Sequence, residues 1–233
     1  TYARRVEKSV TRIAAHFGYD ANLSTVLKTT TLTIKDAQDS SIRRTYISAN
    51  KPMAVNFKKI LELSALSWNI YDNKFTCPQA RKVFAQIVKA RKHGFFKSLF
   101  LVSIATSAFS RFFEGDIGTM AVVFCATLVG FSLRHLMSEH HINIRIQYIV
   151  ASFMASSVAI FGGAFTTTQD VAIASSVVFL VPGVYFINAT IELLNENNIV
   201  ALSRIINVTI LMSCIAIGIF FSLSLAKAGF IHV

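Results

Sequence analysis

The stretch IINVTILMSCIAIGIFFSLSLA, residues 205–226, decides the fold, because it contains no charged side chain. A helix needs about 20 apolar residues to cross the hydrocarbon core of a bilayer. A charge at the bilayer centre costs roughly 2.5–3.5 kcal/mol on insertion scales, so long uncharged runs are typical of membrane spans. Residues 98–110 and 120–133 are further uncharged runs. The sequence predicts a membrane protein that is mainly α-helical.

The charges divide the chain into two parts. Residues 1–94 hold 17 Lys and Arg but 6 Asp and Glu, a net charge of +11, whereas residues 95–233 hold six of each. This pattern predicts a basic cytoplasmic domain over 1–94 and a transmembrane domain over 95–233. Five segments of the second part are apolar and long enough to span, namely 95–113, 117–136, 142–165, 171–191 and 199–230.

The first 94 residues predict a small α+β domain. Apolar residues at helical spacing indicate a helix that stops at Gly18, and two β-branched runs, 24–35 and 42–48, indicate a β-hairpin. Two more helices follow, one over 57–74 and one that begins at Pro78, where proline is tolerated in the first turn.

A basic cluster precedes the first span. It could bind an anionic ligand or nucleic acid, or it could anchor the chain to anionic lipid headgroups. The anchor is favoured and no nucleic-acid partner is expected, because no nucleic-acid-binding motif accompanies the charge. The cluster consists of Arg81, Lys82, Lys89, Arg91, Lys92 and His93.

The junctions between spans predict the orientation. Residues 114–116 and 166–170 carry only acidic charge, whereas residues 134–145 and Arg204 supply basic charge. The positive-inside rule then places the N-terminus in the cytoplasm and the C-terminus outside the cytoplasmic (inner) membrane.

Small residues recur every three or four positions on several predicted spans. Such stripes let helix backbones approach closely, which predicts a packed bundle or an oligomer. The stripes are Ser103, Ser107 and Ser110; Ser152, Ser156, Ala159 and Gly163; and Cys214, Gly218 and Ser222.

The stretch LVPGVYFINATIEL, residues 180–193, predicts a broken span. Pro182 removes a backbone donor and Gly183 loosens the helix. Transporters use such breaks to aim helix N–H groups at anionic substrates. The alternative is a proline kink that serves packing alone, with Glu192 and Arg204 as an interfacial ion pair. Asn207 could line a substrate path or join helices.

Few other patterns point to chemistry. His135, His140 and His141 with Glu139 lie partly in a loop, and no metal site is expected there. The sequence contains no phosphate-binding loop, no GxSxG and no HExxH motif. We therefore expect neither an enzyme nor a bound cofactor.

The chain resembles the threonine/serine exporter (ThrE-like) family, in its split type. The similarity rests on these residues, which span most of the chain: Arg5-Val6-Glu7, Arg12-Ile13-Ala14, Phe113-Glu114-Gly115-Asp116, Leu180-Val181-Pro182-Gly183, Ile187-Asn188-Ala189, Ala201, Leu202 and Arg204. The family commonly has aspartate where Glu192 stands and glycine where Ala201 stands.

The resemblance implies a secondary exporter of small carboxylates, either threonine and serine or dicarboxylates such as succinate. It also implies that a YjjP-like subunit of this kind works with a smaller YjjB-like membrane subunit. In this interpretation Pro182, Gly183, Asn188, Arg204 and Asn207 bind substrate and Glu192 couples transport to protons. The alternative is a membrane anchor that transports nothing and presents the α+β domain as a regulatory or binding module.

Overall fold

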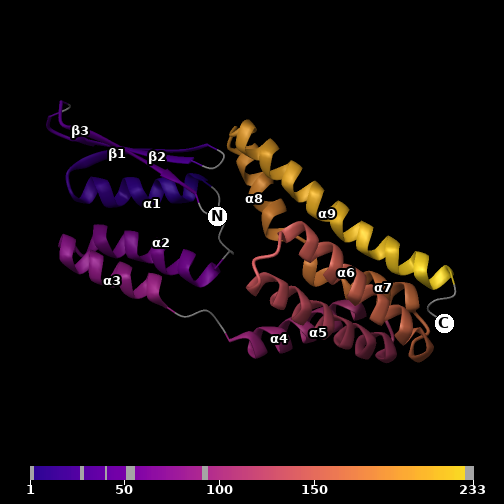
Figure 1. Ribbon diagram of the computed structural model, residues 1–233. Helices are drawn as coiled ribbons and strands as arrows, with labels where there is room; N and C mark the ends of the chain where they lie inside the picture. Colours follow the sequence, from indigo (N-terminus) through magenta and orange to yellow (C-terminus); the bar gives the residue numbers. More distant parts are fainter. Residues whose placement is uncertain (1–2, 27–28, 40, 51–55, 91–93, 229–233) are drawn as a thin grey trace. The chain divides into compact units, whose positions relative to one another are not determined.

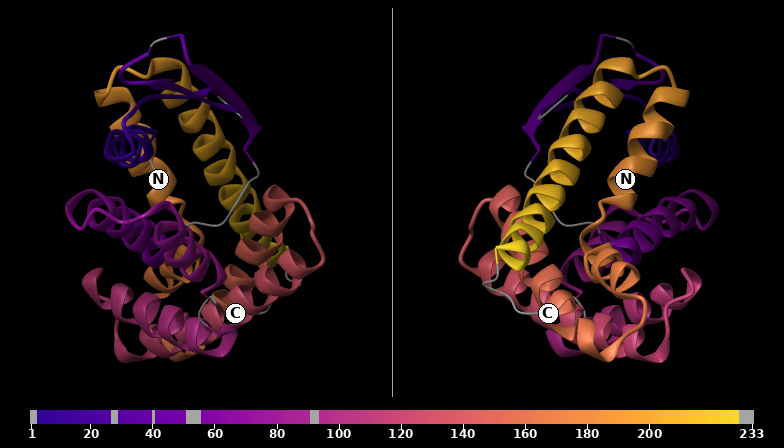
Figure 2. Two further views of the ribbon diagram at one scale, coloured as in Figure 1. Left: turned by 90° about the vertical axis from the view of Figure 1, so that its left-hand side faces the viewer. Right: turned by 90° about the vertical axis from the view of Figure 1, so that its right-hand side faces the viewer.

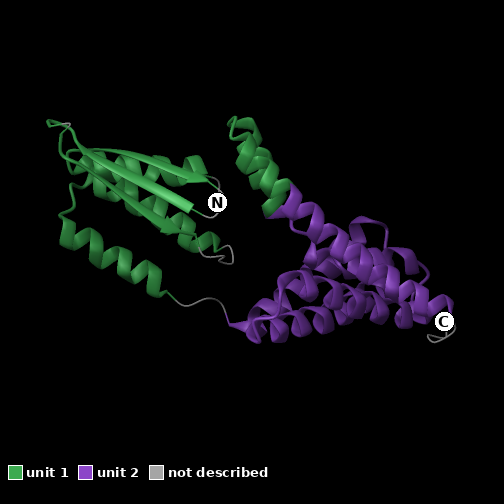
Figure 3. Ribbon diagram, turned by 45° about the horizontal axis from the view of Figure 1, so that its top comes forward, with its two compact units in different colours: residues 1–92, 185–205 green, residues 93–184, 206–233 purple. Residues whose placement is uncertain are grey.

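The structure is a computed structural model that describes residues 3–26, 29–39, 41–50, 56–90 and 94–228. Two compact units make up the chain, residues 1–92 with 185–205 and residues 93–184 with 206–233 (Figure 3). The first unit therefore contains residues 185–205 as well as the N-terminal part. Of the predicted basic cluster, Arg91, Lys92 and His93 lie outside the described residues.

The first unit contains a three-stranded antiparallel sheet in the order β1-β2-β3 (Figure 1). Tyr19 pairs with Asp36 across β1 and β2, and Thr29 pairs with Ala49 across β2 and β3. The predicted two-stranded hairpin is wrong, because run 24–35 contains the end of one strand and most of the next. The early strand was missed because Asp and Asn are depleted in strands, and this one gains support from the helix packed on it. The strands are β1 (Tyr19–Val26), β2 (Thr29–Asp36) and β3 (Arg43–Ala49).

Three helices complete the N-terminal part of this unit. Helix α1 (Ala3–His16) lies along one face of the sheet (Figure 1, Figure 2) and also packs on α2 (Phe57–Asp72). The Asn56 side chain accepts a hydrogen bond from the Lys59 backbone N–H at 3.0 Å and so caps α2. Helix α3 (Cys77–Lys89) has a proline in its first turn, as the sequence predicts.

The second unit is built of apolar helices, and the same run of helices supplies residues 185–205 of the first unit. Four helical segments of the described chain are long and apolar enough to span a membrane, and a fifth qualifies if α7 and α8 form one broken span. The predicted set of apolar spans is thus confirmed as four or five. The segments are α4 (Phe95–Phe112), α5 (Ile117–Glu139), α6 (Ile144–Phe161) with η1 (Gly162–Phe165), α7 (Gln169–Ser176) with η2 (Val178–Leu180), α8 (Gly183–Leu194) and α9 (Asn198–Lys227).

Small side chains bring these helices together. A Cβ atom on Gly218 of α9 would lie 2.5 Å from the backbone oxygen of Ile149 on α6, closer than van der Waals contact permits. One turn farther along α9, Ser222 Oγ lies 2.6 Å from Ser156 Oγ. The prediction that these stripes serve close helix packing is confirmed. On α4, Ser107 donates a hydrogen bond to the Met120 carbonyl of α5 at 2.8 Å.

A hydrogen-bonded carboxylate joins the two acidic junctions of this unit. Asp116 caps α5 by accepting from the Thr119 backbone N–H at 2.6 Å. It also accepts from the Thr166 hydroxyl at 2.9 Å and from both the backbone N–H and the hydroxyl of Thr167 at 3.0 Å. These bonds, with the Thr167 backbone N–H first among them, hold the pKa of Asp116 well below its usual range. The α4–α5 turn and the α6–α7 connection therefore lie at the same end of the unit.

Candidate functional site

The fourth apolar segment is broken at the position that the sequence predicts. Leu180 and Val181 donate backbone hydrogen bonds to carbonyls three residues earlier, as in a 3₁₀ turn, and α8 begins at Gly183. Pro182 lies between them, is buried and has no N–H to continue the ladder. The helical segments on either side meet at 64°.

Gly183 occupies open space at the start of α8. A Cβ atom at this position would meet no atom within 4 Å, so packing does not require glycine here. The first backbone N–H groups of any helix lack partners within the helix, and they form the positive end of its dipole. The first turn of α8 therefore offers donors to an anion.

Glu192, near the end of α8, is fully buried. Its Oε1 lies 3.1 Å from the Arg204 guanidinium of α9. The same oxygen accepts the backbone N–H of Ala3 at 2.8 Å, and Oε2 accepts from the Asn197 side-chain amide at 3.0 Å. A buried carboxylate normally requires such a cation and additional donors. One acidic residue is thereby held by three segments of the first unit.

The first turn of α1 contributes to this site, which sequence reasoning missed. Besides the Ala3 N–H, the Arg4 guanidinium donates to the Asn195 side-chain oxygen in the α8–α9 loop at 2.8 Å. Nearly 190 residues separate these partners along the chain, and no spacing rule reaches that far. The motif Arg5-Val6-Glu7, which carries part of the family resemblance, lies next to Ala3 and Arg4 and gave a hint that this helix matters.

The structure brings together some of the predicted site residues and separates others. Arg204 contacts Glu192, and Asn188 precedes Glu192 by four residues, on the same face of α8. Asn188 is half-buried and hydrogen-bonds no residue that the structure describes. Gly183 lies nine residues before Glu192, about 14 Å along a helix axis at 1.5 Å per residue. Asn207 is exposed on α9 rather than buried.

Other charged groups form smaller local contacts. Arg111, in the last turn of α4, donates to the Gly115 carbonyl at 2.9 Å. His135 lies 3.4 Å from Glu139, one helical turn away. Among the residues that the structure describes, no three His, Cys, Asp or Glu side chains come together as a metal site would require.

The family model described as "Putative threonine/serine exporter" matches residues 1–226. The chain belongs to this family. The resemblance seen in the sequence is thus confirmed. The family to which the chain belongs is one of transporters. With its four or five apolar helical segments, the chain is a multi-pass membrane protein of this exporter family.

Two curated relatives are each named "Probable succinate transporter subunit YjjP". The protein from Klebsiella aerogenes is 24% identical over 219 residues, which cover 91% of this chain and 83% of the relative. The protein from Escherichia coli K12 is 22% identical over 225 residues, which cover 94% and 86%. The word subunit in both names implies that each of these two relatives works with a partner protein. No solved structure matches the chain.

Proposed function

We propose that this chain is one subunit of a secondary exporter that moves small carboxylates, succinate-like dicarboxylates or threonine and serine, across the cytoplasmic membrane. The membership of the exporter family and the names of the two relatives support this proposal. Residues 1–94 form the cytoplasmic domain and residues 95–233 the transmembrane domain, with the C-terminus outside. A smaller, YjjB-like membrane subunit completes the pathway.

The ion pair of buried Glu192 with half-buried Arg204 is the observation that carries the proposal. A guanidinium binds carboxylates through parallel N–H donors, so a substrate carboxylate can replace the Glu192 carboxylate at Arg204. Protonation of Glu192 removes its negative charge and frees Arg204 for the substrate. Proton binding and substrate binding therefore favour each other, as linkage between two sites requires.

The polar face of α8 supplies the rest of the path. Asn188 lies one helical turn before Glu192 and has an amide that no described residue engages. It offers both a donor and an acceptor to a substrate. At the other end of α8, the Gly183 N–H donates to the Val181 carbonyl, and the next backbone N–H groups of the first turn receive a carboxylate in a second position. A substrate thus passes between two anion-binding positions on one helix.

The test is export of radiolabelled succinate, threonine and serine from proteoliposomes that contain this chain and its partner subunit. We expect Asn188→Ala to slow export by about tenfold or more, as the loss of one good hydrogen bond to a charged substrate predicts. Pro182→Ala should also slow export, because alanine supplies the missing backbone N–H and lets the helix continue through the break. Thr190→Ala is the matched control, because Thr190 is exposed on the same helix and bonds only to the Phe186 carbonyl. Unchanged export by both variants contradicts the path along α8.

The same preparation tests the alternative of a membrane anchor. An anchor predicts that the full chain with its partner moves no carboxylate, and that Pro182 and Asn188 variants match the wild type in every assay. Export by this chain without a partner contradicts the two-subunit arrangement.

A further inference from the structure

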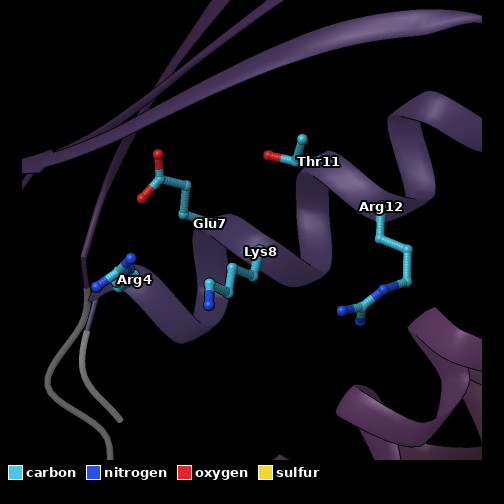
Figure 4. Close-up of a pocket in the computed structure, with 5 residues that line it drawn as sticks. All are labelled: Arg4, Glu7, Lys8, Thr11 and Arg12. Carbon is cyan, nitrogen blue, oxygen red and sulfur yellow. The ribbon is translucent and has the colours of Figure 1, made fainter.

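An open pocket lies along the exposed face of α1 (Figure 4). It is a shallow hollow of about 370 Å³ that opens widely to its surroundings. Figure 4 shows that all its labelled side chains come from this one helix. They are Arg4, Glu7, Lys8, Thr11 and Arg12.

The three cations of the pocket follow one another at four-residue spacing. Residues four apart lie on the same side of a helix, about 6 Å from each other along its axis. That separation suits an anion with two charged ends, such as a short dicarboxylate. With Glu7 as the one acidic residue, the lining carries a formal net charge of +2.

No carboxylate of the described chain neutralises these cations. Arg12 donates to the Ser67 hydroxyl at 2.8 Å, and its guanidinium lies 3.5 Å from the centre of the Trp68 ring. Both partners are neutral, so they fix the position of the guanidinium and leave its charge available. Arg4 donates to the neutral Asn195 side chain. Lys8 is exposed and contacts no partner among the described residues.

We infer that this pocket binds a small dianion, a dicarboxylate or a phosphate, and thereby regulates access to Glu192. Arg4 connects the two places, because it lines the pocket and also bonds Asn195 at the end of α8. The preceding residue, Ala3, donates its backbone N–H to Glu192. An anion that engages Arg4 competes with Asn195 and loosens the contact that covers Glu192. The binding site stands on its own geometry, whereas its effect on Glu192 rests on the proposed function.

Trp68 gives a direct measure of binding, because it is the one tryptophan of the chain. The full chain in neutral detergent is titrated with succinate and, separately, with inorganic phosphate at constant ionic strength while tryptophan emission is recorded. We expect a saturable change in emission for a dianion and none for chloride. Lys8→Gln weakens the apparent affinity by about tenfold or more, as the loss of one charge-assisted hydrogen bond predicts.

Lys82→Gln is the matched control, because Lys82 is exposed on α3 and lies outside the pocket. The absence of a saturable change, or an equal loss of affinity in both variants, overturns the site. Anionic lipid is the other source of phosphate. A change that occurs only in phosphatidylglycerol nanodiscs, and not with free dianions in phosphatidylcholine nanodiscs, overturns a site for a soluble anion.

The regulatory step has its own readout. Hydrogen exchange at the backbone amides of residues 3–8 and 192–197 is compared with and without the dianion, and we expect faster exchange when it is bound. Unchanged exchange with intact Trp68 titration overturns the effect on Glu192. Failure of the proposed function is distinguishable, because the absence of carboxylate export by the wild-type chain with its partner would leave the Trp68 titration intact.

Discussion

Two carboxylates of this chain, Asp116 and Glu192, are held in opposite ways. Asp116 accepts hydrogen bonds only from neutral groups, two backbone N–H donors and two threonine hydroxyls. Glu192 also accepts from two neutral donors, but its third partner is the Arg204 guanidinium. Asp116 is half-buried, whereas Glu192 has no exposed surface.

Under the proposed function, this difference separates a structural carboxylate, Asp116, from an exchangeable one, Glu192. A substrate carboxylate gains little from replacing the carboxylate of Asp116. The groups that donate hydrogen bonds to Asp116 carry no charge and belong to the turns that these bonds close. Under the proposed function, Arg204 can pair with either of two anions, the Glu192 carboxylate or a substrate carboxylate. We therefore expect changes at Asp116 to affect stability, and changes at Glu192 and Arg204 to affect transport.

Removal of Arg204 should have the largest effect. Arg204→Gln leaves the Glu192 charge buried without a cation, and breaking one side of such a pair costs about 3–5 kcal/mol. We expect export to stop and the unfolding temperature in detergent to fall sharply. The double variant Glu192→Gln with Arg204→Gln should recover most of the stability and none of the export. Equal stability of the single and double variants would show that the pair is not coupled.

Gly118→Ala should have the second-largest effect, a loss of stability in the region around Asp116. A Cβ atom here would overlap the Phe165 carbonyl oxygen, so the α6–α7 connection must move away from α5 and from Asp116. Overpacking of this kind costs about 1–3 kcal/mol, measurable as a lower unfolding temperature. Gly183→Ala is the matched control, because a Cβ there meets no neighbour. Equal losses in the two variants would contradict the close approach.

Asp116→Asn should lower stability and leave the pH dependence of export unchanged. The hydrogen bonds depress the folded-state pKa, so Asp116 stabilises the fold fully above the unfolded value of about 3.9 and loses this contribution as the pH falls below it. Thermal unfolding at a series of pH values checks the direction of this change in stability with pH. The difference between wild type and Asp116→Asn should be constant near neutral pH and shrink in acid. A difference that grows in acid would contradict it.

Ser103→Ala should have the smallest effect on stability. It extends the comparison of the two carboxylates to an uncharged polar group. Ser103 Oγ is the one buried side-chain polar atom without a hydrogen-bond partner among the described residues. Its replacement removes an unsatisfied group, so stability should stay the same or rise by up to about 1 kcal/mol. Ser107→Ala is the control, because Ser107 bonds the Met120 carbonyl and its loss should destabilise.

The sequence predicts what depends on local chemistry and on helical spacing. The break at Pro182, the small-residue contacts of Gly218 and Ser222, and the apolar spans follow from proline geometry, residue volume and the absence of charge. The first strand, β1, was missed, because its Asp and Asn residues lower the local β propensity and the helix packed on it lies outside any local pattern. The contact of Ala3 with Glu192 could not be predicted, since tertiary packing alone brings such distant residues together.

Export from proteoliposomes as a function of pH tests the central claim most directly, with wild type and Glu192→Gln compared beside the partner subunit. The account predicts that the wild-type rate changes with pH, because protonation of Glu192 frees Arg204. It predicts that Glu192→Gln, whose amide carries no charge to lose, keeps one rate from mildly acidic to mildly alkaline pH. A Glu192→Gln protein with the wild-type pH profile would contradict it.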